Sequence, residues 1–142
     1  MQLSRRVATP ADLPFLLALR SESMGPHLSA AGIDRSDDAQ LARVLHCFDC
    51  AQIVLGDGKP VGLLKLQRDP GEWRVLQVQL AETVRGQGLG RRLLEEVLSD
   101  AKQAGAKVTL TVLKANPAKG LYERLGFSVV GEDEHEFHMA TV

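Results

Sequence analysis

Apolar and polar positions alternate along several short stretches of the chain, and this period of two predicts β-strands. These stretches, with one continuous β-branched run at 107–113, are 2–8, 52–55, 61–67, 72–80, 107–113, 127–130 and 136–140. Other stretches place leucine and valine three or four residues apart, which predicts amphipathic helices. The predicted helices run over 9–23, 37–48, 91–104 and 116–125.

Short turn and cap motifs mark the boundaries of these elements. Thr9-Pro10 and Asn116-Pro117 each offer an N-cap side chain followed by a proline at the first helical position. Asp57-Gly58 is a strong hairpin turn, and Gly126 is expected to end the last helix. Residues 24–36 show neither period and contain two glycines and a proline, so we expect a loop there.

The order of the predicted elements indicates a mixed α/β fold. Hairpins fill the first half of the chain, and the second half alternates strand, helix, strand, helix and strand. A chain of 142 residues can build one hydrophobic core but is too short for two ordinary domains. We therefore expect a single domain, residues 1–142, with helices packed on a mixed sheet.

Composition and charge argue against several classes of function. The hydrophobic share of 44% and the charged share of 25% are ordinary for a globular protein. Seventeen basic and 18 acidic residues give a formal net charge of −1, and only six residues are aromatic (one Trp, one Tyr and four Phe), which disfavours a nucleic-acid-binding module. No apolar run approaches the roughly 18 residues that span a bilayer, and no signal-peptide pattern opens the chain. We expect a cytoplasmic protein that binds neither nucleic acid nor membrane.

Cys47 and Cys50 are the only cysteines and form a Cys-x-x-Cys pair directly after His46. A zinc site would need a second pair of ligands, and a redox motif normally opens a helix after a strand. Here the pair ends a predicted helix and leads into a strand. This placement favours two small, partly buried thiols over metal or redox chemistry, and we expect no metal.

The segment Arg85-Gly86-Gln87-Gly88-Leu89-Gly90 lies between a predicted strand and a predicted helix. Glycines let the backbone approach a ligand closely, and a helix N-terminus presents unpaired N–H groups and a positive dipole end. A strand, a glycine-rich turn and a helix start together predict an anion site, most often for phosphate. The alternative is a plain tight turn.

The chemistry of this segment excludes two common nucleotide motifs. Gly90 is followed by Arg91 and Arg92, whereas a triphosphate-binding loop needs Lys and Ser or Thr after its last glycine. The dinucleotide fingerprint fails as well, because the three glycines are spaced two apart and no acidic residue follows a second strand at the expected distance. The phosphate ligand is therefore of another kind.

A second motif runs from Asn116 to Phe127 and reads Asn-Pro-Ala-Lys-Gly-Leu-Tyr-Glu-Arg-Leu-Gly-Phe. It describes a capped helix that delivers one tyrosine, Tyr122, to a surface shared with the preceding strand. Together with the segment 85–90, it resembles the GCN5-related N-acetyltransferase (GNAT) family. The resemblance covers residues 3–140, and its specific part is 76–127. It implies a GNAT-like fold with a central mixed, splayed β-sheet of about six to seven strands flanked by about four helices.

The resemblance also implies acetyl-CoA as cosubstrate. In the family, backbone amides of the loop matching residues 85–90 bind the pyrophosphate, and the strand matching 76–80 carries a bulge and splays away from the strand matching 107–113. The cofactor arm enters that gap and pairs with exposed backbone, here expected at Val78 and Leu80. Asn116 matches a position that contacts the arm. Arg85 and Arg91 either add charge near the phosphates or are solvated surface arginines.

For the reaction, the resemblance makes Tyr122 the general acid that protonates the departing thiolate. Its alternative role is that of a core tyrosine with a satisfied hydroxyl. Many relatives carry a glutamate base on the strand before the loop, where this chain has Gln77 and Gln79. Neither amide can act as a base, but Gln79 could order a water molecule. A backbone N–H on the same strand is expected to stabilise the oxyanion.

Substitute bases are Glu22 at the end of the first helix and His27 in the expected loop, although each is more simply a surface residue. Glu82 is expected to be solvated. The acidic run 132–136 with His135 is most simply a polar hairpin, and alternatively the rim of an acceptor site for a cation.

The predicted function is transfer of an acetyl group from acetyl-CoA to a primary amine of a small molecule or peptide by direct attack. Glu22, Met24 and His27 hint at a small amine or amino-acid-like acceptor near residues 21–36. The alternative is a non-catalytic acyl-CoA sensor, favoured by the missing strand glutamate. The resemblance also leaves a homodimer open, because relatives often pair through the sheet or the terminal strands.

Overall fold

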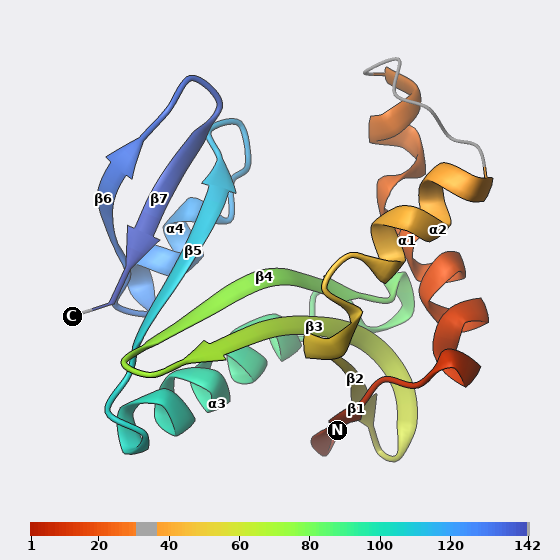
Figure 1. The fold of residues 1–142 in the computed structure, drawn as a ribbon, viewed down its shortest axis with the longest axis horizontal. Coiled ribbons are helices and arrows are strands. Elements are labelled where there is room, and N and C mark those ends of the chain that lie inside the picture. The colour runs from red at the N-terminus through yellow and green to blue at the C-terminus, as the bar shows by residue number, and fades with distance from the viewer. Residues whose placement is uncertain (31–36, 142) are drawn as a thin grey trace. The chain divides into compact units, whose positions relative to one another are not determined.

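A computed structural model describes the backbone of residues 1–30 and 37–141, and the side chains of residues 1–21 and 38–141. The chain divides into two compact units. Figure 1 shows the helices and strands that are described below. The first unit comprises Met1–Lys65 and Gln77–Leu89, and the second comprises Leu66–Leu76 and the chain from Gly90 onward. Strands β3 (Lys59–Asp69) and β4 (Glu72–Leu80) run through both units.

The first unit is built on antiparallel strands. Strand β1 (Leu3–Val7) pairs with β2 (Ala51–Gly56), and β2 pairs with β3. Asp57 and Gly58 both adopt positive φ, 52° and 82°, which is the backbone of a type I′ turn and confirms the predicted hairpin. The core cluster of this unit contains Ala8, Leu16, Leu19, Val44, Ala51, Ile53 and Leu63.

The first helical segment starts at the predicted cap. Thr9 and Asp12 form a capping box around the 3-10 turn η1 (Pro10–Asp12), and α1 (Leu13–Ala30) follows without a break. The prediction of a loop over residues 24–36 was wrong for 24–30, because α1 continues through Gly25 and Pro26 to Ala30. Residues 31–36 of the predicted loop lie outside the described residues. Gly and Pro lower helix propensity but do not end a helix by themselves, and the residues around them are ordinary helix formers.

Helix α2 (Asp37–Leu45) ends three residues earlier than predicted. Cys47 has a left-handed backbone with φ of 52°, so the chain leaves the helical path before the short 3-10 helix η2 (Phe48–Cys50). Buried Lys65 donates from Nζ to the carbonyl oxygens of Arg43, Val44 and His46. A lysine therefore binds the end of α2 and accounts for its early stop.

In the second unit, β5 (Lys107–Leu113) pairs in parallel with the start of β4 and antiparallel with β7 (Glu136–Ala140). Strand β6 (Ser128–Glu132) pairs with the outer side of β7. The 15-residue helix α3 (Leu89–Gln103) and α4 (Lys119–Arg124) supply the helical part, and α4 lies behind β5 and β7 in Figure 1. Alternate residues of β5 are buried, namely Val108, Leu110 and Val112.

Helix α4 begins two residues later than the Asn116-Pro117 motif predicted. The Asn116 side chain does act as a local cap, but it accepts from the backbone N–H of Ala118 at 2.9 Å and so shapes a turn before the helix. Gly126, with φ of 102°, ends the helix as predicted.

The strand order is β1-β2-β3-β4-β5-β7-β6, a seven-stranded mixed sheet. With four α-helices among the described residues, this confirms the predicted mixed α/β fold class. Within the described part of the chain, no helix combines the length and apolarity that a membrane crossing requires.

Candidate active site

The glycine-rich segment follows β4 through the 3-10 turn η3 (Glu82–Val84). Buried Val84 and Leu89 hold its two ends, while Gly86 and Gly88 are exposed and adopt φ of 77° and 73°. A Cβ at either glycine would meet no atom within 4 Å. Glycine is therefore required for its backbone conformation rather than for space, and the loop backbone is open to a ligand.

Helix α3 begins at Leu89, directly after Gly88. The first N–H groups of a helix have no intrahelical acceptor, and the dipole of a 15-residue helix places partial positive charge at this end. Loop and helix start together form the anion-binding arrangement that the sequence predicts.

The two arginines flanking this loop have different partners. Arg85 donates from Nε to the Leu80 carbonyl oxygen at 3.1 Å, which ties the start of the loop to the end of β4. Arg91 lies on the first turn of α3 and pairs with Glu95 at 2.8 Å. Both side chains are exposed.

The end of β4 packs tightly against β3. A Cβ at Gly62 would lie 2.5 Å from the Gln79 carbonyl oxygen and 2.8 Å from Leu80 Cδ2. Val78, Gln79 and Leu80 are partly buried. The parallel ladder between β4 and β5 covers Glu72–Arg74 and Lys107–Thr109 and ends four residues before Val78.

Tyr122 lies in α4 and is half-buried, with its ring against Phe127. Burial raises the pKa of the Tyr122 hydroxyl above its usual value. The hydroxyl therefore stays protonated at neutral pH and can donate a proton. Asn116, in the turn before α4, is exposed.

The structure places the candidate bases as follows. Gln77 and Gln79 lie on β4, and Glu82 is exposed in η3. Glu22, Met24 and His27 fall within α1, but their side chains lie outside the described residues. The predicted site residues thus form two sets, one in each unit. The boundary between the two units falls between Leu89 and Gly90, within the glycine-rich segment 85–90.

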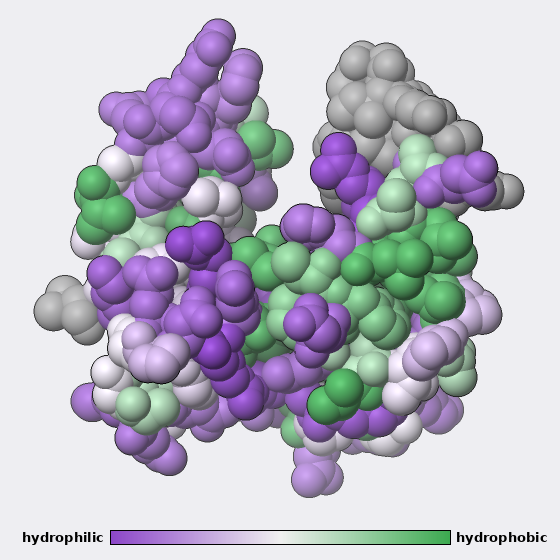
Figure 2. All heavy atoms as spheres, in the orientation of Figure 1, coloured by the Kyte–Doolittle hydropathy of each residue, from purple (hydrophilic) through white to green (hydrophobic). Residues whose placement is uncertain are grey.

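The run 132–136 forms the turn of the β6–β7 hairpin, over which Figure 2 shows hydrophilic residues. Asp133 accepts from the backbone N–H groups of His135 and Glu136 and contacts His138 Nε2 at 3.1 Å. These hydrogen bonds lower the pKa of the Asp133 carboxyl. No pattern in the sequence selected His138 as a site residue. The only available signal is its position two residues after Glu136 on an alternating strand, which places both side chains on the same face of the sheet.

Cys47 and Cys50 are free and partly buried. The Cys50 thiol donates to the Cys47 carbonyl oxygen at 2.9 Å, and burial raises the pKa of this thiol. Within the part of the chain that the structure describes, no three or more His, Cys, Asp or Glu side chains gather as metal ligands would.

Comparison with known families adds the deciding observation. Residues 33–141 match the family model described as the acetyltransferase (GNAT) domain. The chain belongs to the GNAT family. It is therefore an acyltransferase, and the resemblance to this family seen in the sequence is confirmed.

Sequence identity to individual proteins is low. An L-methionine sulfoximine/L-methionine sulfone acetyltransferase of Pseudomonas paraeruginosa is 27% identical over 93% of this chain and 84% of its own length. The PaiA N-acetyltransferase of Thermoplasma acidophilum, solved in complex with coenzyme A, has a TM-score of 0.75 and 20% identity over 99% of both chains. An acetyltransferase of Thermus thermophilus has a TM-score of 0.79 and 21% identity over 99% of this chain and 96% of its own. These structures share the fold.

Proposed function

We propose that this protein is an acetyl-CoA-dependent N-acetyltransferase that acetylates a primary amine of a small molecule or peptide. The observation that carries the proposal is the loop of Gly86 and Gly88, whose left-handed backbone opens directly onto the N-terminus of α3. Such a loop suits the pyrophosphate of CoA, because its amides bind oxygen atoms without a metal or a lysine. Membership of the GNAT family supports the same donor.

In the proposed reaction, the neutral amine attacks the carbonyl carbon of the thioester. A C–N bond forms, the carbonyl oxygen becomes an oxyanion, and a backbone N–H on the free part of β4 stabilises it. The C–S bond then breaks, and Tyr122 gives its proton to the departing thiolate. The amine loses its proton to water, which Gln79 helps to orient, and the Tyr122 phenolate takes up a proton from solvent, so that the amide and the CoA thiol are the net products.

The relative that acetylates L-methionine sulfoximine or L-methionine sulfone supports an acceptor of amino-acid type. The family match covers residues of both units, which supports one N-acetyltransferase domain over residues 1–142.

Initial rates of thiol release from acetyl-CoA over a panel of amines test the proposal. The panel should contain L-methionine sulfone, other free amino acids, simple alkylamines and a short peptide, with calorimetric titration of acetyl-CoA alongside. We expect saturable, amine-dependent release with at least one class of acceptor. Tight binding of acetyl-CoA with no amine-dependent release from any acceptor would instead indicate an acyl-CoA sensor.

A further inference from the structure

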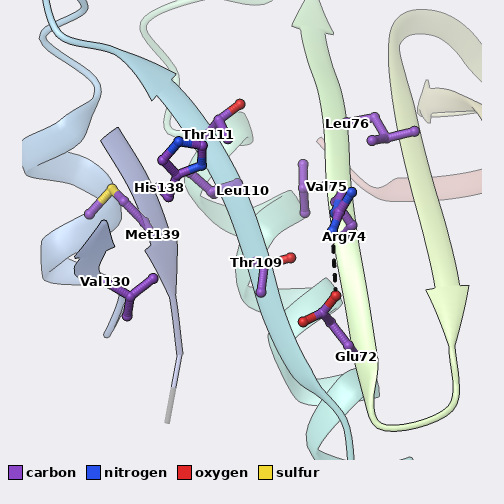
Figure 3. A pocket seen from close by; sticks show the side chains of 10 residues that line it. All are labelled: Glu72, Arg74, Val75, Leu76, Thr109, Leu110, Thr111, Val130, His138 and Met139. Atoms are coloured by element: carbon purple, nitrogen blue, oxygen red, sulfur yellow. Dashed lines mark ion pairs between the residues drawn. The ribbon is translucent and has the colours of Figure 1, made fainter. Parts of the chain in front are cut away.

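A cavity of about 490 Å³ lies in the second unit, at the point where the ladder between β4 and β5 ends. Figure 3 shows its lining, which comes from β4, β5, β7 and β6. The volume is within the range of small-molecule sites. All of its lining residues belong to this one unit, so it is a property of that unit alone.

Strand register brings four polar side chains to the same face of this cavity. Arg74 pairs with Thr109 across β4 and β5, and Thr111 pairs with His138 across β5 and β7. Partners in register point to the same face of a sheet, and so do residues two apart on one strand. Arg74, Thr109, Thr111 and His138 therefore share a face, and all four line the cavity.

The ion pair that Arg74 makes within its own chain is a long one. One of its guanidinium nitrogens, Nη2, lies 3.6 Å from Glu72 Oε2, which is too long for a good hydrogen bond. Glu72 also has a second cation, since Lys107 Nζ lies 3.5 Å from its other oxygen. A guanidinium carries five N–H donors in a fork that fits a carboxylate. Arg74 can thus bind a ligand carboxylate while Glu72 stays neutralised by Lys107.

Thr109 adds an unusual hydroxyl. Its Oγ1 is buried, and no residue in the described part of the chain offers it a hydrogen bond. A buried hydroxyl without a partner is unfavourable for stability. Thr109 lines the cavity one strand from Arg74, and a rotation about its χ1 angle would bring the hydroxyl to the cavity side, where it can donate to a ligand oxygen.

The remaining lining divides into a polar and an apolar part. His138 is held through Nε2 by Asp133 at 3.1 Å, which fixes the orientation of its ring. The apolar lining consists of Val75, Leu76, Leu110, Val130 and Met139. Leu76, two residues from Arg74, shares the polar face, whereas the buried Val75, Leu110 and Met139 point to the opposite face of their strands. This combination suits a ligand with a charged end and a short apolar side chain.

We propose that this cavity binds the acceptor and that the acceptor is a small α-amino acid, with its carboxylate on Arg74 and Thr109 and its amino group toward His138. This assignment rests on the proposed function and deepens it. A single carboxylate fits better than a phosphate dianion, because the one guanidinium among the described residues that line the cavity, Arg74, matches one negative charge and the two oxygens of a carboxylate. It also fits better than a peptide N-terminus, which has no carboxylate next to its amine.

The test compares an amino acid with its own carboxamide, for example L-methionine sulfone and L-methionine sulfone amide. For wild-type protein we expect the free acid to have the lower KM. Arg74→Gln should raise the KM of the acid about 10-fold or more and leave the KM values of the amide and of acetyl-CoA nearly unchanged. Arg68→Gln is the matched control, since Arg68 stacks on Trp73 and does not line the cavity. It should leave both acceptors unaffected.

Thr109→Val supplies a second variant of nearly the same shape. It should raise the KM of the acid and at the same time keep or raise Tm, because a methyl group replaces an unpartnered hydroxyl. A purely structural role for Thr109 would not give this combination.

Calorimetric titration of the acid and the amide into CoA-saturated protein keeps the test independent of turnover. Stronger binding of the acid that disappears in Arg74→Gln supports the site. Equal binding of the two compounds, or equal loss in both arginine variants, would overturn it even if amines are acetylated. Absence of acetylation with selective binding of the acid would overturn the proposed function and leave the site standing.

Discussion

The ring of Tyr122 lies edge-on against the ring of Phe127, with centroids 5.9 Å apart and ring planes inclined by 67°. Phe127 is buried, and its backbone N–H donates to the Tyr122 carbonyl oxygen at 3.0 Å. The contact therefore holds the only tyrosine of the chain in place through both ring and backbone. A hydroxyl fixed in this way suits a proton donor, since orientation is part of acid catalysis.

Tyr122→Phe should lower kcat by roughly 10- to 100-fold, because a general acid contributes about 100-fold or more and a thiolate leaving group needs less help than most. The ring contact with Phe127 survives in this variant, so Tm and the affinity for acetyl-CoA should change little. Steady-state kinetics, calorimetry and thermal melts check the three quantities.

The pH profile separates an acid from a structural tyrosine. Because burial raises the pKa of the Tyr122 hydroxyl, wild-type kcat should fall only above the usual titration range of tyrosine. The variant should lack that alkaline fall. Identical profiles and identical rates for the two proteins would remove Tyr122 from the mechanism.

Gly88→Ala tests the loop. The residue has φ of 73° with no neighbour near its Cβ position, so alanine meets backbone strain of about 1–2 kcal/mol rather than a clash. The exposed loop of the free protein can relieve this strain by leaving the left-handed conformation, and binding must then restore it. We expect acetyl-CoA to bind roughly 5- to 30-fold more weakly, as titration would show.

Gly58→Ala is the control for this change, because Gly58 has φ of 82° in the β2–β3 turn and likewise an open Cβ position. It should lower Tm and leave the affinity for acetyl-CoA intact. If both alanines weakened acetyl-CoA binding alike, the loop would have no special role.

The ion pair of Asp12 is expected to make the folding stability of the first unit fall in acid. Arg6 binds both of its carboxylate oxygens, at 2.8 and 2.7 Å, and lowers the pKa of Asp12 from 3.8 to about 2. Between these values the folded protein binds fewer protons than the unfolded chain, so this contribution to stability is complete above about pH 4 and is lost as pH falls toward 2.

Asp12→Asn should cost about 1–2 kcal/mol at neutral pH, a value reduced for screening because the Arg6 side chain is 43% exposed. Urea unfolding between about pH 2 and pH 7 should show a smaller dependence on pH than for wild type. Asp69→Asn, at an exposed position before the β3–β4 turn, should follow the wild-type curve. Parallel curves for wild type and Asp12→Asn would contradict the assignment.

Lys65→Met should destabilise the protein by about 1–3 kcal/mol. Lys65 is 2% exposed, and its ammonium group is the hydrogen-bond donor for three carbonyl oxygens at the end of α2. Methionine keeps most of the volume and removes the donor from all three carbonyl oxygens, of which the Arg43 oxygen still accepts from the His46 backbone N–H. Chemical denaturation measures the loss, and exposed Lys59→Met in the same strand should change stability by less than about 0.5 kcal/mol. Equal effects at the two positions would contradict the role of Lys65.

Local signals predicted much of this fold. Strands β4 and β5 have the predicted bounds, because alternation and a β-branched run need no tertiary information. Asp57-Gly58 formed the predicted turn, since the I′ backbone selects those residues. The extension of α1 through Pro26 was not predictable from the sequence. Tertiary contacts can outweigh the low helix propensity of Gly and Pro, and a local sequence pattern does not show those contacts.

The candidate site was predictable only in part. The loop and Tyr122 stand in contiguous motifs, whereas Arg74, Thr109 and His138 come together only through the pairing of three strands. Strand β7 lies between β5 and β6, an order that no local pattern shows. The sequence therefore could not predict that these side chains line one cavity, because only the order and register of the strands bring them together.

The most direct test of the proposed acetyl transfer measures the ratio of N-acetylated product to released thiol. Purified protein is incubated with acetyl-CoA and L-methionine sulfone, and free thiol and N-acetylated product are quantified in the same samples over time. We expect one N-acetyl group to form for each thiol released, at a rate that saturates with the amine and falls in Tyr122→Phe. Thiol release that does not depend on the amine, or no product with any amino acid or other amine despite bound acetyl-CoA, would contradict the proposed transfer.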